Sequence, residues 1–353
     1  MKLTRREFVA SVPLGVAVAP RAVAADKWPR VPLGLLIYSY GIRARAEKDK
    51  GLADPLRFLH FAHERGANAI QIPLGAQSPA EARTLRRVAE KADMALEGIV
   101  APPTDDHAAL ERFTAELATA HNCGATVVRT VLLAGRRYET FTQASDYTAF
   151  VQRAQAMLQR AEPVAKKHKV HLAVENHKDF RTEELLELLK AISSEFVGVC
   201  IDTGNNLALL EEAPATIAAL APYGRTVHLK DMAVEEAPDG FRLAEVPLGQ
   251  GVLDLPALIA TIRKAQPKIR FHLEMITRDP LSIPCLTEKY WATLERVSGR
   301  ALARMLAFVR QNTRPEPLPR ISSRRLQEQL EVEEANVRAS WDYVAKTGLI
   351  PQS

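Results

Sequence analysis

Four apolar segments each end in side chains of the kinds that bind metal ions, and their spacing limits the folds open to this chain. The segments span residues 170–177, 197–202, 226–231 and 269–274 and hold, at or near their ends, Glu175, Asp202, His228 and Glu274. These four residues lie 27, 26 and 46 positions apart. Because one strand, loop and helix unit takes about 30 residues, the first three occupy equivalent places in successive units. The longer last gap leaves room for an insertion.

The rest of the chain repeats this alternation of apolar segments and amphipathic helices. Four further strands are predicted at 32–40, 67–74, 94–100 and 125–133. Helices are predicted at 55–65, 79–92, 108–121, 146–168, 182–193, 214–221, 255–265 and 287–311. Eight strands alternating with eight helices favour a (β/α)8 TIM barrel over residues 31–311, with its active site at the C-terminal ends of the strands. A doubly wound sheet is disfavoured because no Gly-rich turn follows the first strand.

Residues 312–353 are predicted to form a linker and a C-terminal helix, a helical extension of the barrel. The linker is Pro-rich at 314–319, and the helix at 324–346 carries one apolar stripe. Two interpretations of this helix stay open. It docks on the barrel wall, or it reaches a partner subunit of a homo-oligomer.

The first 25 residues have the features of a twin-arginine signal peptide. Arg5 and Arg6 open the motif at 4–9, a short apolar region follows at 9–19, and residues 22–24 resemble a cleavage site. The apolar region is shorter than the roughly 20 residues that a membrane helix needs. We therefore expect an exported protein, periplasmic or extracellular, without a stable membrane span.

Charge and cysteine content exclude several classes of partner and site. The formal net charge is +5, but six of the basic residues and only two of the acidic ones fall within residues 1–30. The remaining chain is nearly neutral, which disfavours binding to nucleic acid. The three cysteines, Cys123, Cys200 and Cys285, are far apart and form no CxxC pair, so buried free thiols are predicted.

Three carboxylates and one imidazole at neighbouring strand ends predict a divalent metal site. Taken singly, an acid at a strand end is often a helix cap, and a lone His is more often structural than a ligand. Four such residues at corresponding places favour a joint site. Oxygen-rich ligands with one imidazole suit Mn²⁺, Mg²⁺, Co²⁺ or Zn²⁺.

Several motifs resemble the xylose isomerase-like TIM-barrel superfamily and, within it, the sugar phosphate isomerase/epimerase branch. The motifs lie at 175–177 (ENH), 202–205 (DTGN), 228–231 (HLKD) and 247–254 (PLGQGVLD), and the strand that ends in Glu274 completes the set. The resemblance covers roughly residues 31–310. It implies that the four ligands bind a divalent metal, commonly Mn²⁺. It also implies that Glu175 and Glu274 are the catalytic residues and exchange a proton with the carbon beside a substrate carbonyl.

Five further residues are candidates for substrate binding. His177 and Lys230 each lie two positions after a ligand and so share its side of the strand. Asn205 stands where ketose epimerases usually carry a His. These three are predicted to contact substrate; for His177 and Lys230 a supporting structural role is the alternative.

The other two candidates are arginines. Arg129 lies within a predicted strand, where an unpaired charge is costly, so it either pairs with Glu97 or binds substrate. Arg278 lies in the long loop after the last strand, where it either meets the ligand or is solvated.

The leading hypothesis is a metal-dependent isomerase or epimerase of a small-molecule carbohydrate, acting through an enediolate. A metal stabilises the enediolate charge, and a carboxylate on each face takes and returns the proton. A lyase or dehydratase of a keto-sugar, keto-glycoside or inosose is the alternative, because both reactions begin with the same proton abstraction. An apurinic endonuclease-like nuclease is less favoured because the early strand ends, at 72–74 and 100–102, contain no His. A non-catalytic sugar-binding barrel would not need four ligands.

Overall fold

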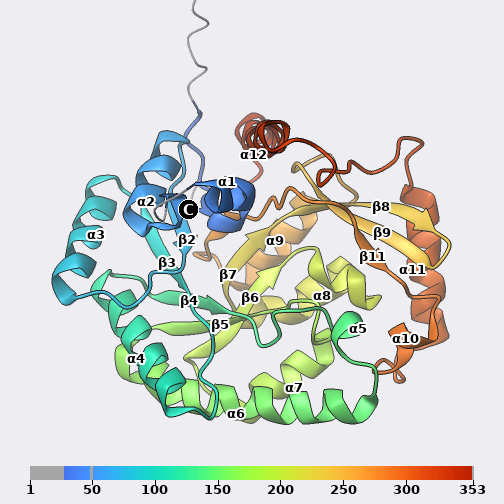
Figure 1. Ribbon diagram of the computed structural model, residues 1–353, viewed down its shortest axis with the longest axis horizontal. Helices are drawn as coiled ribbons and strands as arrows, with labels where there is room; N and C mark the ends of the chain where they lie inside the picture. Colours follow the sequence, from blue (N-terminus) through green and yellow to red (C-terminus); the bar gives the residue numbers. More distant parts are fainter. Residues whose placement is uncertain (1–27, 48–50, 352–353) are drawn as a thin grey trace, which may run out of the picture.

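Eight parallel strands close into a barrel at the centre of the molecule (Figure 1). The computed structural model describes residues 28–47 and 51–351. The barrel strands are β1 (Gly34–Leu36), β2 (Ala69–Ile72), β3 (Ala95–Ile99), β4 (Val127–Thr130), β5 (His171–Glu175), β6 (Val197–Asp202), β7 (Gly224–Leu229) and β10 (Phe271–Leu273). Each pairs with the next around the ring, and β10 closes it against β1. This confirms the predicted (β/α)8 barrel.

Helices surround the barrel, and all of them except the last, α11, connect successive strands. They are α2 (Pro55–Glu64), α3 (Pro79–Lys91), α4 (His107–Asn122), α6 (Ala144–His168), α7 (Thr182–Ile192), α8 (Ala213–Leu220), α9 (Leu255–Ala265) and α11 (Gly299–Asn312). Several begin where the sequence supplies a cap. The Asp54 and Asp254 carboxylates accept from backbone N–H groups in the first turns of α2 and α9, and Ser78 forms a capping box with Glu81 on α3.

The chain after β1 does not continue as the strand predicted up to residue 40. It turns into a short 3-10 helix, η1 (Ile37–Tyr40), and then α1 (Gly41–Ala46). The Ser39 hydroxyl donates to Leu273 O at 2.8 Å and accepts from Met275 N at 3.0 Å. These bonds tie the segment across the end of β10, so the strand ends early.

A small antiparallel sheet lies beside the C-terminal ends of the barrel strands. It has the order β11 (Leu281–Ile283), β9 (Gly240–Val246), β8 (Asp231–Ala237). The sequence predicted only an insertion here, and the hairpin was missed. Its apolar face packs against α11 in a second core that includes Phe241, Leu243 and Ile283. The predicted helix 287–311 is also two helices, α10 (Glu288–Trp291) and α11, because Ser298 caps the start of α11.

Short elements complete the loops around the barrel. They are η2 (Gly51–Ala53), α5 (Arg137–Thr140), η3 (Asn205–Leu209) and η4 (Ala221–Tyr223). Of these, α5 lies in the loop after β4, and η3 lies in the loop after β6.

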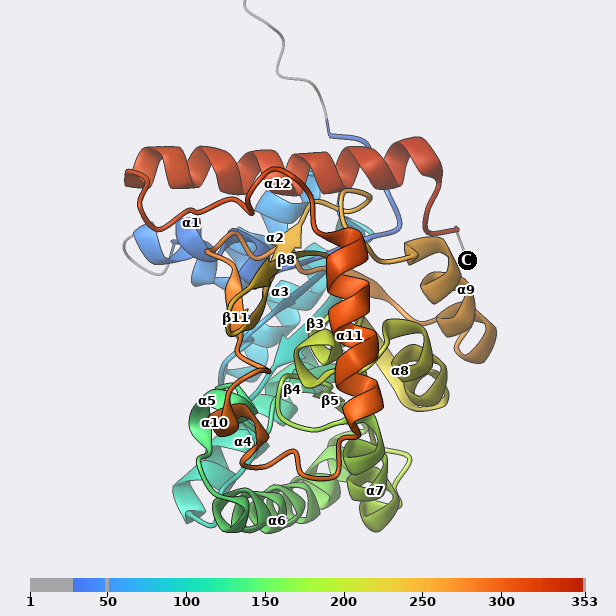
Figure 2. The same ribbon diagram turned by 90° about the vertical axis from the view of Figure 1, so that its right-hand side faces the viewer.

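The C-terminal helix α12 (Leu326–Thr347) lies across the outside of the barrel near α1 (Figure 2). Its Trp341 side chain is fully buried, and Trp341 Nε1 donates to Pro29 O at 3.0 Å. Glu333 accepts from Ile42 N at 2.6 Å and from Arg43 N at 3.0 Å, so it caps the start of α1. The helix therefore docks on its own barrel. A homo-oligomer remains a prediction.

One sequence prediction concerns residues that the structure does not describe, and two others can be compared with it. The twin-arginine segment, residues 1–25, lies outside the described residues. In the described part of the chain, no helix has both the length and the apolar character that a membrane crossing requires. All three cysteines are free and buried, as predicted.

Candidate metal centre

The four predicted ligands converge at the C-terminal end of the barrel. Glu175 and Asp202 are the last residues of β5 and β6, His228 lies near the end of β7, and Glu274 directly follows β10. Each offers one ligand atom, and these atoms all lie within 4.8 Å of one another. The four side chains are no more than 3% exposed. The parallel strands thus bring together residues that are up to 99 positions apart in sequence.

His228 is oriented by a chain of hydrogen bonds inside the barrel. Its Nε2 lies 2.7 Å from the Gln71 side-chain oxygen, and the Gln71 amide donates to Glu97 at 3.1 Å. Because that Gln71 oxygen can only accept, Nε2 carries the proton of the neutral ring. In the neutral ring that would bind a metal, the Nδ1 lone pair points at the carboxylates, 3.3 Å from Glu175 Oε2 and 3.2 Å from Glu274 Oε2. This is the arrangement of a metal-binding histidine and its supporting acceptor.

The loop after β6 holds Asp202 in place. Its Oδ1 accepts from Gly204 N at 2.9 Å and from Asn205 N at 2.8 Å. Its backbone N–H donates to the Asn176 side chain at 2.7 Å. Oδ2 is left without a hydrogen bond of normal geometry. One oxygen thus serves the loop and the other faces the cluster.

Three buried atoms without a hydrogen bond mark the place where a cation fits. Among the described residues, His228 Nδ1, Asp202 Oδ2 and Glu274 Oε2 are buried and make no hydrogen bond of normal geometry. Two of these atoms, Asp202 Oδ2 and Glu274 Oε2, are engaged by ion pairs with Lys230. Buried polar groups are nearly always satisfied, and a cation bound by these three atoms would satisfy them. Three carboxylates and one imidazole are ligands for a divalent ion such as Mn²⁺ or Mg²⁺. The residues present therefore fit the metal that the sequence predicts.

Arg129 binds Glu175 rather than Glu97, so the predicted Arg129–Glu97 pair is wrong. Arg129 Nε donates to Glu175 Oε2 at 2.5 Å, and the guanidinium is buried. Burial alone would raise the pKa of Glu175. The Arg129 guanidinium and the His228 imidazole outweigh that effect and hold this pKa below its usual range. Glu175 is therefore an anion at neutral pH.

Lys230 lies inside the cluster and neutralises part of its charge. Its Nζ is 2.9 Å from Asp202 Oδ2 and 2.9 Å from Glu274 Oε2. Burial would raise the pKa of Glu274, but Lys230 and His228 hold it well below its usual range. The structure thus brings Lys230, predicted as a substrate contact, directly against two of the predicted ligands.

Cys200, on β6, also faces Glu175 and His228. Burial raises the pKa of its thiol to about 11, although His228 opposes the shift. The thiol is therefore protonated at neutral pH and is a poor ligand. The oxygen and nitrogen atoms of the other four residues form the better donor set.

The remaining predicted residues lie around the cluster. Asn205 Nδ2 donates to Glu175 Oε1 at 2.9 Å. His177 is half-buried, its Nδ1 has no partner among the described residues, and burial and Lys178 lower its pKa to about 3. Arg278 Nε donates to Glu245 Oε2 at 3.0 Å, so this partly exposed arginine is paired with a carboxylate.

Two charged residues beside the site were missed by the sequence analysis. Lys178 is 2% exposed and donates to Asn205 Oδ1. Glu245, on β9, pairs with Arg278 and lies 3.8 Å from Lys230 Nζ. The run of charged residues at 175–179 was a signal for Lys178. For Glu245 no local signal exists, because the unpredicted hairpin delivers it.

Asp231 holds the loop at 247–254 in shape. Its carboxylate accepts from the backbone of Gly249 at 3.0 Å, Gly251 at 2.9 Å and Leu253 at 3.2 Å. A Cβ on Gly251 would lie 2.0 Å from Asp231 Oδ1, so only glycine permits this approach. Asp231 therefore holds the loop rather than contacting the cluster.

Comparisons with known proteins agree with this geometry. The family described as xylose isomerase-like TIM barrel matches residues 59–298. This chain belongs to that family. The superfamily assignment made from the motifs is thus confirmed.

Individual proteins share less than a third of their sequence with this chain. A 3-oxo-isoapionate decarboxylase of Pectobacterium atrosepticum is 29% identical over 250 residues, 69% of this chain and 84% of the relative. A xylose isomerase-like TIM barrel protein from Mycobacterium smegmatis, solved with magnesium, has a TM-score of 0.54 at 19% identity, covering 79% of this chain and 98% of that one. D-psicose 3-epimerase, solved with D-fructose, has a TM-score of 0.53 at 17% identity over the same shares. The two solved structures show a shared fold.

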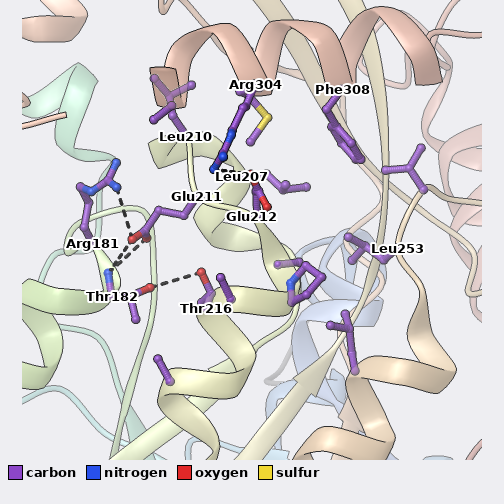
Figure 3. A pocket seen from close by; sticks show the side chains of 18 of the residues that line it. Arg181, Thr182, Leu207, Leu210, Glu211, Glu212, Thr216, Leu253, Arg304 and Phe308 are labelled. Atoms are coloured by element: carbon purple, nitrogen blue, oxygen red, sulfur yellow. Dashed lines mark hydrogen bonds and ion pairs between the residues drawn. The ribbon is translucent and has the colours of Figure 1, made fainter. Parts of the chain in front are cut away.

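A separate groove of about 940 Å³ lies away from the ligands, between α7, α8 and α11 (Figure 3). Leu207, Leu253 and Phe308 are among its apolar lining residues. Its buried carboxylate, Glu211, accepts from Thr182 N at 3.0 Å and is thus already engaged. None of the four ligands lines this groove. The groove is therefore a feature separate from the candidate metal centre.

Proposed function

We propose that this protein is a divalent-metal-dependent enzyme that isomerises or epimerises a sugar or sugar derivative by moving a proton beside a carbonyl. One observation carries the proposal: three carboxylates and an oriented imidazole converge, and three of their buried atoms make no hydrogen bond with the described residues. The magnesium in the related Mycobacterium smegmatis structure supports a divalent ion. We favour Mn²⁺, with Mg²⁺, Co²⁺ and Zn²⁺ as alternatives.

The side chains of the cluster divide the work of this reaction. When bound, a divalent cation supplies a Lewis acid that stabilises negative charge on the substrate oxygens. Glu274 takes the proton from the carbon beside the carbonyl. Glu175, held by Arg129 and Asn205, is the second carboxylate that can exchange a proton with this carbon.

Return of the proton decides the product. If Glu175 takes up a proton from solvent and delivers it to the opposite face of the same carbon, the product is an epimer. If Glu274 returns the proton to the neighbouring carbon, the product is an isomer. Lys230, between Asp202 and Glu274, offsets the negative charge that builds up on the substrate.

NMR in D₂O tests the proposal. The purified protein with Mn²⁺ is given a panel of ketoses, inososes and 3-keto-glycosides. We expect deuterium to enter beside a carbonyl, and we expect Glu274→Gln or a chelator to abolish this. Glu183→Gln, on the exposed face of α7, is the matched control and keeps the exchange. Exchange that persists in Glu274→Gln would refute the assignment of the base.

A lyase that acts on a keto-sugar, keto-glycoside or inosose is the second candidate, and the decarboxylase among the relatives favours it. Proton transfer from one side only suffices for an elimination. Glu274 takes the proton, and the electron pair left on carbon expels the substituent on the next carbon.

The decarboxylase among the relatives gives this candidate a further variant. There the bond to the carboxyl carbon breaks, its electrons pass to the neighbouring carbonyl, CO₂ leaves, and a proton is added to the carbon. The same NMR panel separates the candidates. An isomerase or epimerase conserves all carbons and substituents, whereas a lyase releases a fragment.

We also propose that the protein is exported through the twin-arginine route to the periplasm or beyond. The support is the motif at residues 4–9 with its apolar region and cleavage site. A reporter fused to residues 1–30 should be exported by a bacterium with this route. The paired change Arg5→Lys and Arg6→Lys should retain it inside the cell, and export that survives the change would contradict the proposal.

A further inference from the structure

Lys178 is a buried ammonium group that lacks an anionic partner. Its side chain is 2% exposed, and it forms no ion pair with any carboxylate of the described residues. Its one hydrogen bond runs to the neutral side chain of Asn205. Burial, together with the charges of Lys230 and Arg278, lowers its pKa to about 8. Burying an unpaired charge is costly, so such a group points to a ligand that pairs with it.

Lys178 and Lys230 approach the same oxygen atom. Both donate to Asn205 Oδ1, Lys230 at 3.3 Å and Lys178 more closely. The other side of Asn205 donates to Glu175 Oε1 at 2.9 Å. Two ammonium groups are therefore bridged by a single neutral oxygen directly beside the proposed metal ligands.

A closed charge pair and an unused hydroxyl lie beside the two lysines. Glu245 on β9 is engaged by Arg278 through two hydrogen bonds, so it attracts Lys178 without forming an ion pair with it. The Tyr138 hydroxyl is buried and makes no hydrogen bond with the described residues. It lies close enough to Arg278 and Glu245 for their charges to affect its pKa. The Lys178 ammonium, with Lys230 beside it, and a hydroxyl donor thus face a possible ligand oxygen.

The charge balance of the site favours a negatively charged substrate. Among the described residues, four cationic side chains meet four carboxylates: Arg129, Lys178, Lys230 and Arg278 against Glu175, Asp202, Glu245 and Glu274. A divalent cation adds two positive charges. Asp179, whose pKa burial raises to about 7, removes at most one of them. The loaded site is therefore cationic before substrate binds.

We propose that Lys178, Lys230 and Asn205 form a subsite for the carboxylate of a sugar acid, so that the substrate is an oxo acid rather than a neutral keto-sugar. This inference rests on the proposed function, because the subsite adjoins the proposed metal centre. The carboxylate bridges the two ammonium groups. Its single charge, together with the charge that develops on the enediolate, offsets the excess positive charge. A phosphate dianion carries two charges and would leave the site with excess negative charge.

Binding of inert probes tests the subsite without turnover. Calorimetry on the full chain with Mn²⁺ compares D-gluconate, D-glucitol and D-glucitol 6-phosphate, which differ in the terminal group and lack a carbonyl. We expect gluconate to bind at least about tenfold more tightly than glucitol, because hydrogen bonds to charged groups are worth that much. Tighter binding of the phosphate than of gluconate would overturn the choice of a carboxylate.

Lys178→Met separates the lysine pair from the metal as the source of this preference. The variant keeps the length of the side chain and removes its charge. We expect gluconate to lose about tenfold or more in affinity while glucitol is unchanged. Lys190→Met, at an exposed position on α7, is the control and should retain the preference. A preference for gluconate that survives in Lys178→Met would overturn the proposal.

Two parallel readouts keep the result interpretable. Removing an unpaired buried charge does not destabilise a protein, so the melting temperature of Lys178→Met should equal or exceed that of the wild type. Mn²⁺ affinity should stay within about twofold, because Lys178 is not among the ligands. If Mn²⁺ binds and neutral keto-sugars exchange deuterium, but no preference for gluconate depends on Lys178, the subsite is refuted and the proposed function stands. If Mn²⁺ does not bind, the proposed function fails first.

Discussion

The Arg129 guanidinium on β4 donates to the Glu175 carboxylate at the end of β5, with Nε and Oε2 2.5 Å apart. The two strands are neighbours, and Arg129 is paired in register with Ala173, two residues before Glu175. The guanidinium therefore holds Glu175 ionised and in one orientation before any metal or substrate binds. A metal site of three acids in a buried barrel needs such a counter-charge.

Arg129→Met should destabilise the metal-free protein by about 3–5 kcal/mol, because it leaves the buried Glu175 charge unpaired. Denaturant unfolding with a chelator measures this. Arg136→Met is the matched control: its pair with Glu139 is more exposed, so a loss of under about 1 kcal/mol is expected. Equal losses in the two variants would show that the buried pair has no special role.

Gln71→Leu should weaken Mn²⁺ binding by about 10–100-fold, because it removes the acceptor that fixes the protonated nitrogen of His228. The measurement is a titration followed by electron paramagnetic resonance of free Mn²⁺. Gln152→Leu, at an exposed position on α6, should leave the affinity unchanged. Unchanged affinity in Gln71→Leu would mean that β7 alone orients the imidazole.

The sequence was sufficient for the barrel and for the convergence of its ligands, because both follow from repetition. Glu175, Asp202 and His228 end successive strands, and parallel strands carry such residues to one edge. The hairpin β8–β9 follows no such repeat. It lies within one long connection, where the sequence alone did not distinguish two short strands from a loop.

Lys178 shows where reasoning from strand periodicity stops. Alternation from Glu175 predicts that His177 points toward the site and Lys178 away from it. The strand ends at Glu175, however, and the chain turns, so Lys178 is buried beside Asn205 and His177 is left half-exposed. Glu245 illustrates the other limit, because only the tertiary position of β9 brings it to Lys230.

Asp179→Asn should stabilise the metal-free protein more at pH 8 than at pH 4. Burial raises the pKa of Asp179 to about 7 from 3.8, so the folded state binds the proton more tightly than the unfolded state. The contribution of protonated Asp179 to the stability of the folded state is therefore complete below about pH 4 and is lost as the pH rises through 7. The difference between variant and wild type should grow by up to about 4 kcal/mol over this range. Unfolding curves at the two pH values measure it, and a constant difference would contradict the burial of an ionisable Asp179.

Glu333→Gln should cost about 1–3 kcal/mol, because an amide cannot accept from both Ile42 N and Arg43 N as the carboxylate does. Thermal unfolding compares it with Glu331→Gln, an exposed position on the same helix, where a change within about 0.5 kcal/mol is expected. A loss as small as in the control would mean that α12 contributes little to the barrel.

The most direct test of the account is a Mn²⁺ titration of the purified chain by calorimetry. We expect one Mn²⁺ per chain. Burial lowers the pKa of His228, but Cys200 and the neighbouring Glu274 and Glu175 raise it well above its usual value, so binding should release a proton. Asp202→Asn and Glu274→Gln should each abolish tight binding, while Glu183→Gln retains it. Absence of binding, or binding that survives both ligand variants, would contradict the metal centre on which the proposed function rests.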